Sequence, residues 1–167
     1  MMLDIIRVRS EADAVDVRLL VAEFFSWMRD RYPEGAANIT AYWNKQDMPT
    51  QLQYLLTIFA PPKAECLLAR LNGEPVGIVM TKSHSDGMCE MNRMYVRPTA
   101  RGHGVGRALV AELLVAAQGL GYKRMMLAGG PRHTEALALY RSFGFADDQS
   151  LPDTGAGDLE VRMIRDL

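Results

Sequence analysis

The sequence predicts an α/β fold, and three observations lead to that prediction. Apolar runs typical of strands alternate with helical patterns in the order β-α-(α)-β-β-β-α-β-α-β. The dipeptide Asn72-Gly73 separates two of these runs and is a strong signal for an antiparallel hairpin. A glycine-rich turn at 101–107 joins another run directly to the start of a helix. With 167 residues and no linker or repeat, the chain is expected to form a single domain over residues 1–167.

The N-terminal segment predicts a strand followed by a long helix. Asp4–Arg9 alternates weakly and contains β-branched residues, which favours a strand. Ser10 is suited to cap the helix that follows, Glu11–Arg31, and the turn Tyr32-Pro33-Glu34-Gly35 ends it. The side chains expected along one side of this helix are Val15, Leu19, Ala22, Phe25 or Ser26, and Met28 or Arg29.

Segment 36–62 admits two interpretations. A helix capped by Asp47 or Thr50 is expected from about Gln51 to Phe59, before Pro61-Pro62 ends it. The aromatic residues of the segment are Tyr42, Trp43, Tyr54 and Phe59. These rings either pack as the core of a helical insertion or wall a substrate pocket, and the sequence leaves both interpretations open.

The rest of the chain predicts strands around two further helices. Three strands are expected in succession, with a polar loop Ser83–Gly87 before the third: Glu65–Leu71, Pro75–Lys82 and Met88–Val96. A central helix follows the glycine-rich turn, and Gly119 and Gly121 end it. The remaining elements are a strand Lys123–Ala128, a helix Thr134–Ser142 that ends at Gly144, and a closing strand Asp158–Asp166.

The glycine-rich turn is the first candidate binding site. The run Met94-Tyr95-Val96 precedes it, and Gly102, Gly104 and Gly106 stand at alternate positions. Glycines let a ligand approach the backbone closely, and the first N–H groups of a helix have no intrahelical partner. These groups carry partial positive charge, to which Arg101 and Arg107 add full charges. The turn is therefore suited to a phosphate or pyrophosphate.

Two common phosphate loops do not match this turn. A P-loop ends in Gly-Lys-Ser/Thr, whereas Gly106 is followed by Arg107-Ala108. The dinucleotide fingerprint needs a third small residue, and that place holds Arg107 or Leu109. What remains is Arg101-x-x-Gly104-x-Gly106, which resembles the acyl-CoA pyrophosphate loop of the GNAT superfamily of N-acyltransferases, Gln/Arg-x-x-Gly-x-Gly/Ala. An ordinary glycine-rich strand–helix connection is the alternative.

A second motif supports the same resemblance. Ala136-x-x-Leu139-Tyr140-x-x-x-Gly144-Phe145 is similar to the GNAT element that carries a helix tyrosine and then Gly-Phe. The resemblance covers roughly Glu65 to Phe145. It implies a mixed, mostly antiparallel sheet of about six or seven strands flanked by about four helices. It also implies an N-acetyltransferase that moves an acetyl group from acetyl-CoA to a primary amine by direct attack in a ternary complex.

The resemblance assigns catalytic roles to Glu90 and Tyr140. An alkylamine is protonated at pH 7 because its pKa is near ~10.4, so a general base is needed, and Glu90 occupies the position of one. Tyr140 is the candidate general acid that protonates the departing thiolate. The alternatives are a Glu90 that forms an ion pair with Arg93 or another neighbour, and a Tyr140 that only packs against the sheet.

The resemblance also assigns residues to the cofactor. Backbone groups of the strand before the turn are expected to bind the pantetheine arm, and backbone N–H groups of the turn the pyrophosphate. His133 stands where the family often has Asn, and is a hydrogen-bond donor, a cation near the phosphates, or a surface residue without a role. The assigned residues are Met94, Tyr95, Val96, Arg101, Gly102, His103, Gly104, Val105, Gly106, Arg107, His133, Ala136 and Tyr140.

Arg93 lies three residues after Glu90, so on a regular strand the two side chains face opposite sides. A bulge would change that. Arg93 either forms an ion pair or binds an acidic group of the substrate, and the ion pair is the simpler expectation.

Composition excludes several other classes. The net charge of −1 and the lack of a basic run argue against nucleic acid as a partner. Two cysteines, Cys66 and Cys89, give neither a disulfide framework nor a metal site. No signal peptide or membrane span is expected, which favours the cytoplasm. The acceptor is expected to be a small-molecule or peptide amine, and the resemblance makes a homodimer possible. An inactive acyl-CoA-binding module and a protein-association module remain as alternatives.

Overall fold

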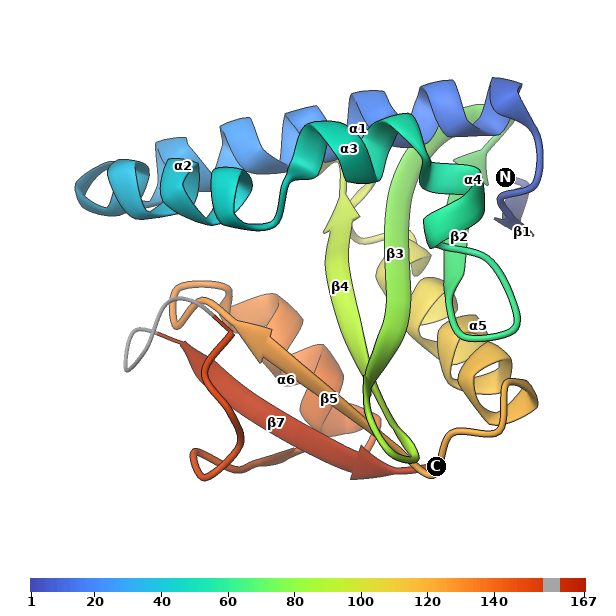
Figure 1. Cartoon of the computed structure of the whole chain (residues 1–167). Coiled ribbons are helices and arrows are strands. Elements are labelled where there is room, and N and C mark those ends of the chain that lie inside the picture. Colours follow the sequence, from blue (N-terminus) through green and yellow to red (C-terminus); the bar gives the residue numbers. More distant parts are fainter. Residues whose placement is uncertain (155–159) are drawn as a thin grey trace.

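The computed structural model of the chain describes residues 1–154 and 160–167. Over these residues the strands form one seven-stranded sheet in the order β1-β2-β3-β4-β5-β7-β6. The strands are β1 (Leu3–Arg7), β2 (Glu65–Leu71), β3 (Glu74–Ser85), β4 (Met88–Val96), β5 (Arg124–Gly129), β6 (Ala146–Asp147) and β7 (Val161–Asp166). Every pairing is antiparallel except β4 with β5. The predicted mixed, mostly antiparallel sheet is confirmed (Figure 1).

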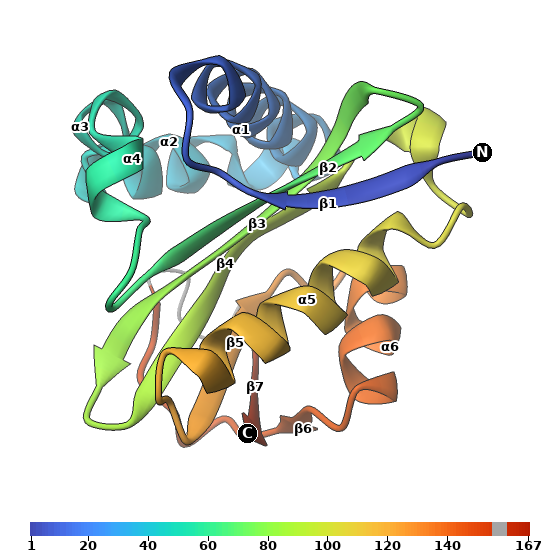
Figure 2. The same ribbon diagram turned by 90° about the vertical axis from the view of Figure 1, so that its right-hand side faces the viewer.

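Helices cover both faces of the sheet (Figure 2). They are α1 (Glu11–Arg31), α2 (Ala36–Lys45), α3 (Met48–Gln53), α4 (Leu55–Ile58), α5 (Val105–Gly119) and α6 (Thr134–Ser142). The first four pack on one face and enclose one apolar core with β2, β3 and β4. The other two pack on the opposite face over a second core. None of the helices in the described part of the chain is long and apolar enough to cross a membrane.

The sheet forks between β4 and β5, and this fork determines where ligands can enter. The two strands pair in parallel only over Met88–Glu90 and Arg124–Met126. Beyond Glu90 they separate, which Figure 1 shows as a V that opens away from the shared end. The rest of β4 therefore turns an unpaired edge toward the gap. An unpaired strand edge offers N–H and C=O groups to a ligand.

Local chemistry explains several of the predicted elements. The Ser10 hydroxyl accepts a hydrogen bond from the Asp13 N–H at 3.2 Å and so caps α1. Asn72 and Gly73 have φ of +52° and +85°, which suits the tight hairpin between β2 and β3. Gly144 ends α6 with φ of +87°. All three signals depend on local backbone conformation, and the structure confirms them.

Other expectations about the elements were wrong. Segment 36–60 holds three helices, α2, α3 and α4, because α2 follows Gly35 without a side-chain cap and so carried no start signal. β1 begins at Leu3 and ends at Arg7, and β3 continues through the predicted loop to Ser85. The two-residue strand β6 was not predicted. The start expected for the last strand at Asp158 lies outside the described residues, and β7 begins at Val161.

The buried side of α1 also differs from the prediction. Val15 and Leu19 are 55% and 51% exposed. The side that packs against the sheet consists of Ala14, Val17, Leu20, Val21 and Phe25. Both rows have helical spacing, so α1 is apolar on two sides and the sequence pattern could not separate them. Phe25 is the residue that the two rows share.

Candidate active site

The fork between β4 and β5 contains a groove of about 480 Å³, here called the fork groove. Its walls are the second half of β4, the turn from Ala100 to Arg107, the end of β5, and α6. All the residues predicted to bind the cofactor line it except His103. The His103 ring instead contacts the carbonyl oxygens of Ala100 and Arg101 at 3.2 and 3.0 Å. His103 is an exposed residue of the turn.

The glycine-rich turn has the conformation that anion binding needs. Gly102 and Gly104 have φ of +79° and +78°, a region that side chains disfavour. No heavy atom lies within 4 Å of a Cβ built on either residue, so the space beside the backbone is open. Gly104 precedes α5, whose first N–H groups lack intrahelical acceptors. The turn therefore presents backbone donors to an open surface.

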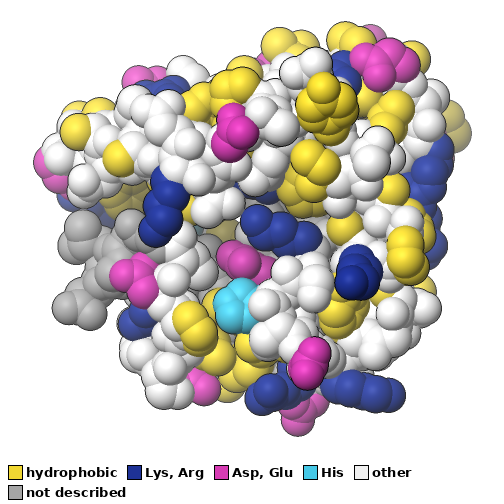
Figure 3. All heavy atoms as spheres, viewed as in Figure 1, with side chains coloured by type: hydrophobic (Ala, Val, Ile, Leu, Met, Phe, Trp, Pro, Cys, Tyr) yellow, Lys and Arg dark blue, Asp and Glu magenta, His cyan; other side chains and the backbone are white. Residues whose placement is uncertain are grey.

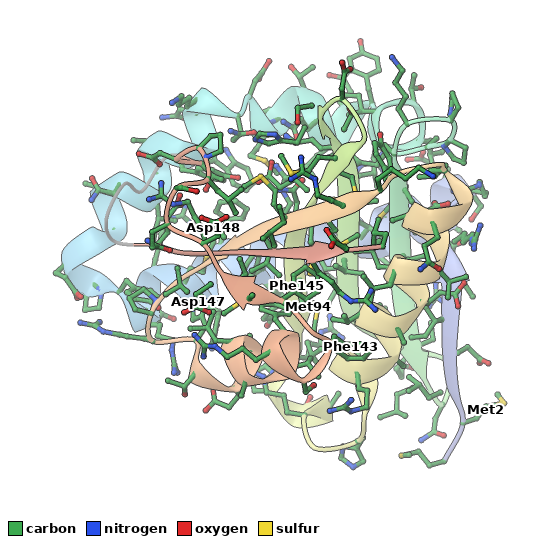
Figure 4. The ribbon with its side chains drawn as sticks, turned by 90° about the horizontal axis from the view of Figure 1, so that it is seen from below. Met2, Met94, Phe143, Phe145, Asp147 and Asp148 are labelled. Atoms are coloured by element: carbon green, nitrogen blue, oxygen red, sulfur yellow. The ribbon has the colours of Figure 1, made fainter. Side chains whose placement is uncertain are left out.

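Gly106 has a different role from the other two glycines. A Cβ there would lie 2.9 Å from Met94 Cε and 3.3 Å from Leu139 Cδ2. Its small size lets α5 approach β4 and α6 closely. Figure 4 shows Met94 near Phe143 and Phe145, which follow α6, and all three belong to the same apolar cluster. The groove thus has a packed apolar base.

The two arginines of the turn point to different surroundings. Arg101 Nε donates to the Val96 carbonyl at 3.0 Å, and its guanidinium lies 4.8 Å from the Trp27 ring. Arg107 lies over the Phe143 ring at 5.2 Å. Both side chains lie at the rim of the fork groove and add positive charge there.

Tyr140 lies on α6 and lines the fork groove. It is buried, and its ring packs against Phe145 with the centroids 6.1 Å apart. Burial raises the pKa of the Tyr140 phenol, so the group keeps its proton at neutral pH. A protonated phenol that faces the groove is a hydrogen-bond donor for a ligand there.

A second cavity of about 250 Å³, here called the helix-side pocket, lies between the sheet and the helices α1 and α2. The space-filling view shows a hollow beneath α1 and α2, with acidic and basic side chains in it (Figure 3). Much of its wall is apolar, from Phe24, Phe25, Met28, Ile39 and Tyr42. Glu90 is half-buried and lines this pocket, opposite Lys82 in the strand register.

The two cavities share a wall. Residues that line both include Phe24, Met28, Met91, Arg93, Gly129 and His133. Glu90 lines the helix-side pocket and Tyr140 lines the fork groove, so the two predicted catalytic residues belong to different cavities that share this wall. A molecule in each cavity would meet the other at this shared wall.

His133 is part of the junction rather than a surface residue. Its ring lies 4.9 Å from the Trp27 ring and 5.3 Å from the Tyr32 ring, and its Nε2 is buried without a hydrogen-bond partner. Burial, together with the charges of Arg31 and Arg101, lowers the pKa of His133 to about 4. The ring is neutral at pH 7, so the expectation of a cation near the phosphates is not supported.

The structure also brings Arg93 into the site, through a bulge. Met80 pairs with Asn92 and Ile78 pairs with Tyr95, so two residues of β4 lie opposite Val79 alone. Arg93 has φ of +52° at this bulge. As a result Arg93 and Glu90 line the same pocket, and Arg93 has no ion pair among the described residues. The expected ion pair is not found among the described residues, and the shared pocket with Glu90 was not expected because a single sequence gives no signal for a bulge at this position.

The comparisons with known proteins agree with this architecture. The family model described as the acetyltransferase (GNAT) family matches residues 21–145. The N-acetyltransferase YjgM of Escherichia coli is 36% identical over 121 residues, which are 70% of this chain and 72% of that protein. The IAA acetyltransferase of Azospirillum brasilense is 33% identical over 122 residues, 71% of this chain and 80% of that one. The PaiA N-acetyltransferase of Thermoplasma acidophilum, solved with coenzyme A, has the same fold, with a TM-score of 0.74 at 16% identity over 100% of both chains.

Proposed function

Because the chain belongs to the GNAT acetyltransferase family and is an acyl-CoA-dependent N-acetyltransferase, we propose that it transfers an acetyl group to a primary amine by direct attack at the junction of its two cavities. In this proposal acetyl-CoA occupies the fork groove and the acceptor amine occupies the helix-side pocket. The observation that carries the proposal is the shared wall, with Glu90 on one side and Tyr140 on the other.

The fork groove fits acetyl-CoA in its chemistry. The open backbone at Gly102 and Gly104, the start of α5, and the charges of Arg101 and Arg107 suit the pyrophosphate. The unpaired edge of β4 from Met94 to Val96 suits the amide groups of the pantetheine arm, which would extend the sheet as a strand does. PaiA, whose fold this chain shares, was solved in complex with coenzyme A, which supports coenzyme A as a ligand of this fold.

The reaction needs a proton acceptor and a proton donor. Glu90 removes a proton from the substrate ammonium, directly or through a water molecule, and the free amine attacks the thioester carbonyl. The carbon–sulfur bond then breaks as the amide forms. Tyr140 donates its proton to the departing thiolate, which leaves as coenzyme A. The proton that the nitrogen loses on becoming an amide returns to Tyr140 through solvent, so the phenol is restored. Holding the amine and the thioester beside one another supplies much of the acceleration.

The two cysteines support direct transfer rather than an acyl-enzyme. Both are buried, and burial raises the pKa of each thiol. Cys89 belongs to the core on the α5 side of the sheet, and Cys66 to the core beneath α1. Neither cysteine lines either cavity. A protonated thiol away from the junction is a poor acyl carrier.

The test is turnover of acetyl-CoA with a panel of primary amines in the wild type and in Glu90→Gln. Loss of the general base is expected to lower turnover by about 10²- to 10⁴-fold without changing acetyl-CoA binding. Glu74→Gln is the matched control, because Glu74 is an exposed strand residue outside both cavities. Turnover by Glu90→Gln equal to that of the wild type would remove Glu90 as the base. Acetyl-CoA binding without turnover of any amine would favour a binding module.

A further inference from the structure

We propose that Arg93 binds a carboxylate of the acceptor, so that the acceptor is an amino acid with an apolar side chain rather than a simple amine or a polyamine. The inference rests on the proposed function, because it places the acceptor in the helix-side pocket. It depends on the bulge in β4, which brings Arg93 to the same pocket as Glu90.

Arg93 is a buried cation that lacks an anionic partner among the described residues. It is 6% exposed. The other buried arginine in this part of the chain, Arg162, lies 3.8 Å from a carboxylate oxygen of Glu160. A guanidinium cannot shed its proton to avoid the cost of burial, so a buried arginine is normally paired. Among the buried arginines of the described residues, Arg93 is therefore the exception, and a carboxylate of the acceptor would supply its missing partner.

The groups that contact the Arg93 guanidinium directly are neutral and mostly weak acceptors. One terminal nitrogen donates to Gln51 Oε1 and lies near Met48 Sδ, both at 3.0 Å. The other lies 3.9 Å from Met80 Sδ, and the Phe59 ring is 5.5 Å from the guanidinium carbon. Nε is buried without any partner. Thioethers accept hydrogen bonds weakly, so the described residues leave the hydrogen-bonding capacity of the guanidinium partly unused, and a planar oxyanion would use it better.

The other charges near Arg93 favour an anion. Lys82 pairs with Glu90 in the strand register. Burial lowers the pKa of Lys82, and the nearby charge of Arg93 lowers it further. The Glu160 carboxylate already has partners: the N–H and hydroxyl of Thr154 donate hydrogen bonds to it at 2.8 and 2.6 Å, and Arg162 forms an ion pair with it. Two cations thus share Glu90, and a carboxylate would balance them.

The rest of the pocket matches the rest of an amino acid. The apolar wall of Phe24, Phe25 and Ile39 suits an apolar side chain, and about 250 Å³ suits a small molecule. Asn92 also lines the pocket, and its Oδ1 is a buried acceptor without a partner among the described residues. An acceptor suits the ammonium of an amino acid, as the guanidinium of Arg93 suits its carboxylate.

The experiment compares amines that differ only in the carboxylate. Initial rates are measured with phenylalanine against phenethylamine, and with leucine against isoamylamine, in the wild type and in Arg93→Met. The wild type is expected to prefer the amino acid of each pair. Arg93→Met is expected to reduce that preference about 10- to 100-fold, through KM, while turnover of the simple amine persists. Comparing variant with wild type on the same pair cancels the intrinsic reactivity of the two amines.

Two further variants separate recognition from folding. Arg93→Lys keeps the charge and loses the planar fork, so it should retain part of the preference. Arg70→Met is the matched control, because Arg70 pairs with Asp13 and Asp16 outside both cavities and its loss should leave the preference unchanged. If Arg93→Met does not fold, the preference of the wild type and of Arg93→Lys still decides the question.

Three results would overturn the assignment. The first is a wild type that uses simple amines as well as amino acids. The second is an Arg93→Met variant in which the rates with the amino acid and with the simple amine fall equally. The third is binding of phenylalanine that does not depend on Arg93. The last is measured by calorimetry and needs no turnover. Absence of turnover with every amine would instead count against the proposed function, and the calorimetric result would still decide the role of Arg93.

Discussion

The fork groove and the helix-side pocket share a wall but are built in different ways. The groove is formed by backbone: the unpaired edge of β4, the positive φ at Gly102 and Gly104, and the start of α5. The identity of most side chains there matters little, provided that glycine keeps the backbone open. A site of this kind suits the same ligand in many sequences.

The helix-side pocket is formed by side chains from several distant segments. Phe24 and Met28 come from α1, Tyr42 from α2, and Glu90 and Arg93 from β4. Changing one of these residues changes what the pocket can accept and leaves the backbone of the groove intact. In the proposed arrangement the groove binds the acetyl-CoA that every reaction shares, and the pocket determines the choice of acceptor. A substitution on one side of the shared wall should act there and spare the other side.

Gly104→Glu is expected to have the largest effect, which is the loss of acetyl-CoA binding. A side chain at φ of +78° costs about 1 kcal/mol or more, and a carboxylate placed there repels the pyrophosphate. Acetyl-CoA at a hundred times its Kd should raise the wild-type Tm by about 5–10 °C, and the variant should show no rise. Thermal unfolding with and without acetyl-CoA measures this.

Gly73→Glu is the control for this prediction. Gly73 has φ of +85°, and the space around a Cβ built on it is open, so a glutamate there introduces the same backbone strain and the same charge. Gly73 lies in the hairpin between β2 and β3 instead of the glycine-rich turn. It should lose stability as Gly104→Glu does and keep the rise with acetyl-CoA. A normal rise in Gly104→Glu would mean that the glycine-rich turn is not the pyrophosphate site.

Tyr140→Phe should have a smaller effect, confined to turnover. The phenylalanine keeps the packing against Phe145 and removes only the hydroxyl. Turnover is expected to fall about 10²-fold, the lower end of the range for general acid catalysis, because the thiolate then leaves without a proton donor. The rise in Tm with acetyl-CoA should stay near that of the wild type. Turnover at the wild-type rate would leave Tyr140 with a packing role alone.

The same contrast explains how much could be predicted from the sequence. The turn at 101–107, the hairpin at Asn72-Gly73 and the end of α6 at Gly144 follow from backbone conformations that few residues adopt. These features fix the fork groove, and the residues expected to line it, other than His103, do line it. Glycine positions are visible in one sequence because no other residue replaces glycine without strain.

The helix-side pocket could not be predicted in the same way. Its walls depend on how α1 and α2 pack, and α1 buries the row that contains Leu20 instead of the expected row that contains Leu19. Arg93 enters the pocket because of a one-residue bulge, and alternation alone places it on the other face. Tertiary packing determines both the buried side of α1 and the position of Arg93, and the local sequence carries no signal for either.

His133 lies on the wall that the two cavities share. Its substitution is expected to change the pH dependence of stability, a smaller effect than that of Gly104→Glu on acetyl-CoA binding or of Tyr140→Phe on turnover. Its pKa of about 4 is below the value of ~6.5 in an unfolded chain, so the native state favours the neutral ring. The stabilisation is complete above about pH 6.5 and is lost as the pH falls toward 4. Because the ring is partly exposed, we expect the free energy of unfolding to fall by about 1 kcal/mol, or Tm by a few °C, between pH 7 and 4.

In thermal unfolding, His133→Asn should lack this dependence of Tm on pH, whereas His103→Asn should keep it because His133 is intact. An unchanged dependence of Tm on pH in His133→Asn would show that the acid sensitivity comes from another group.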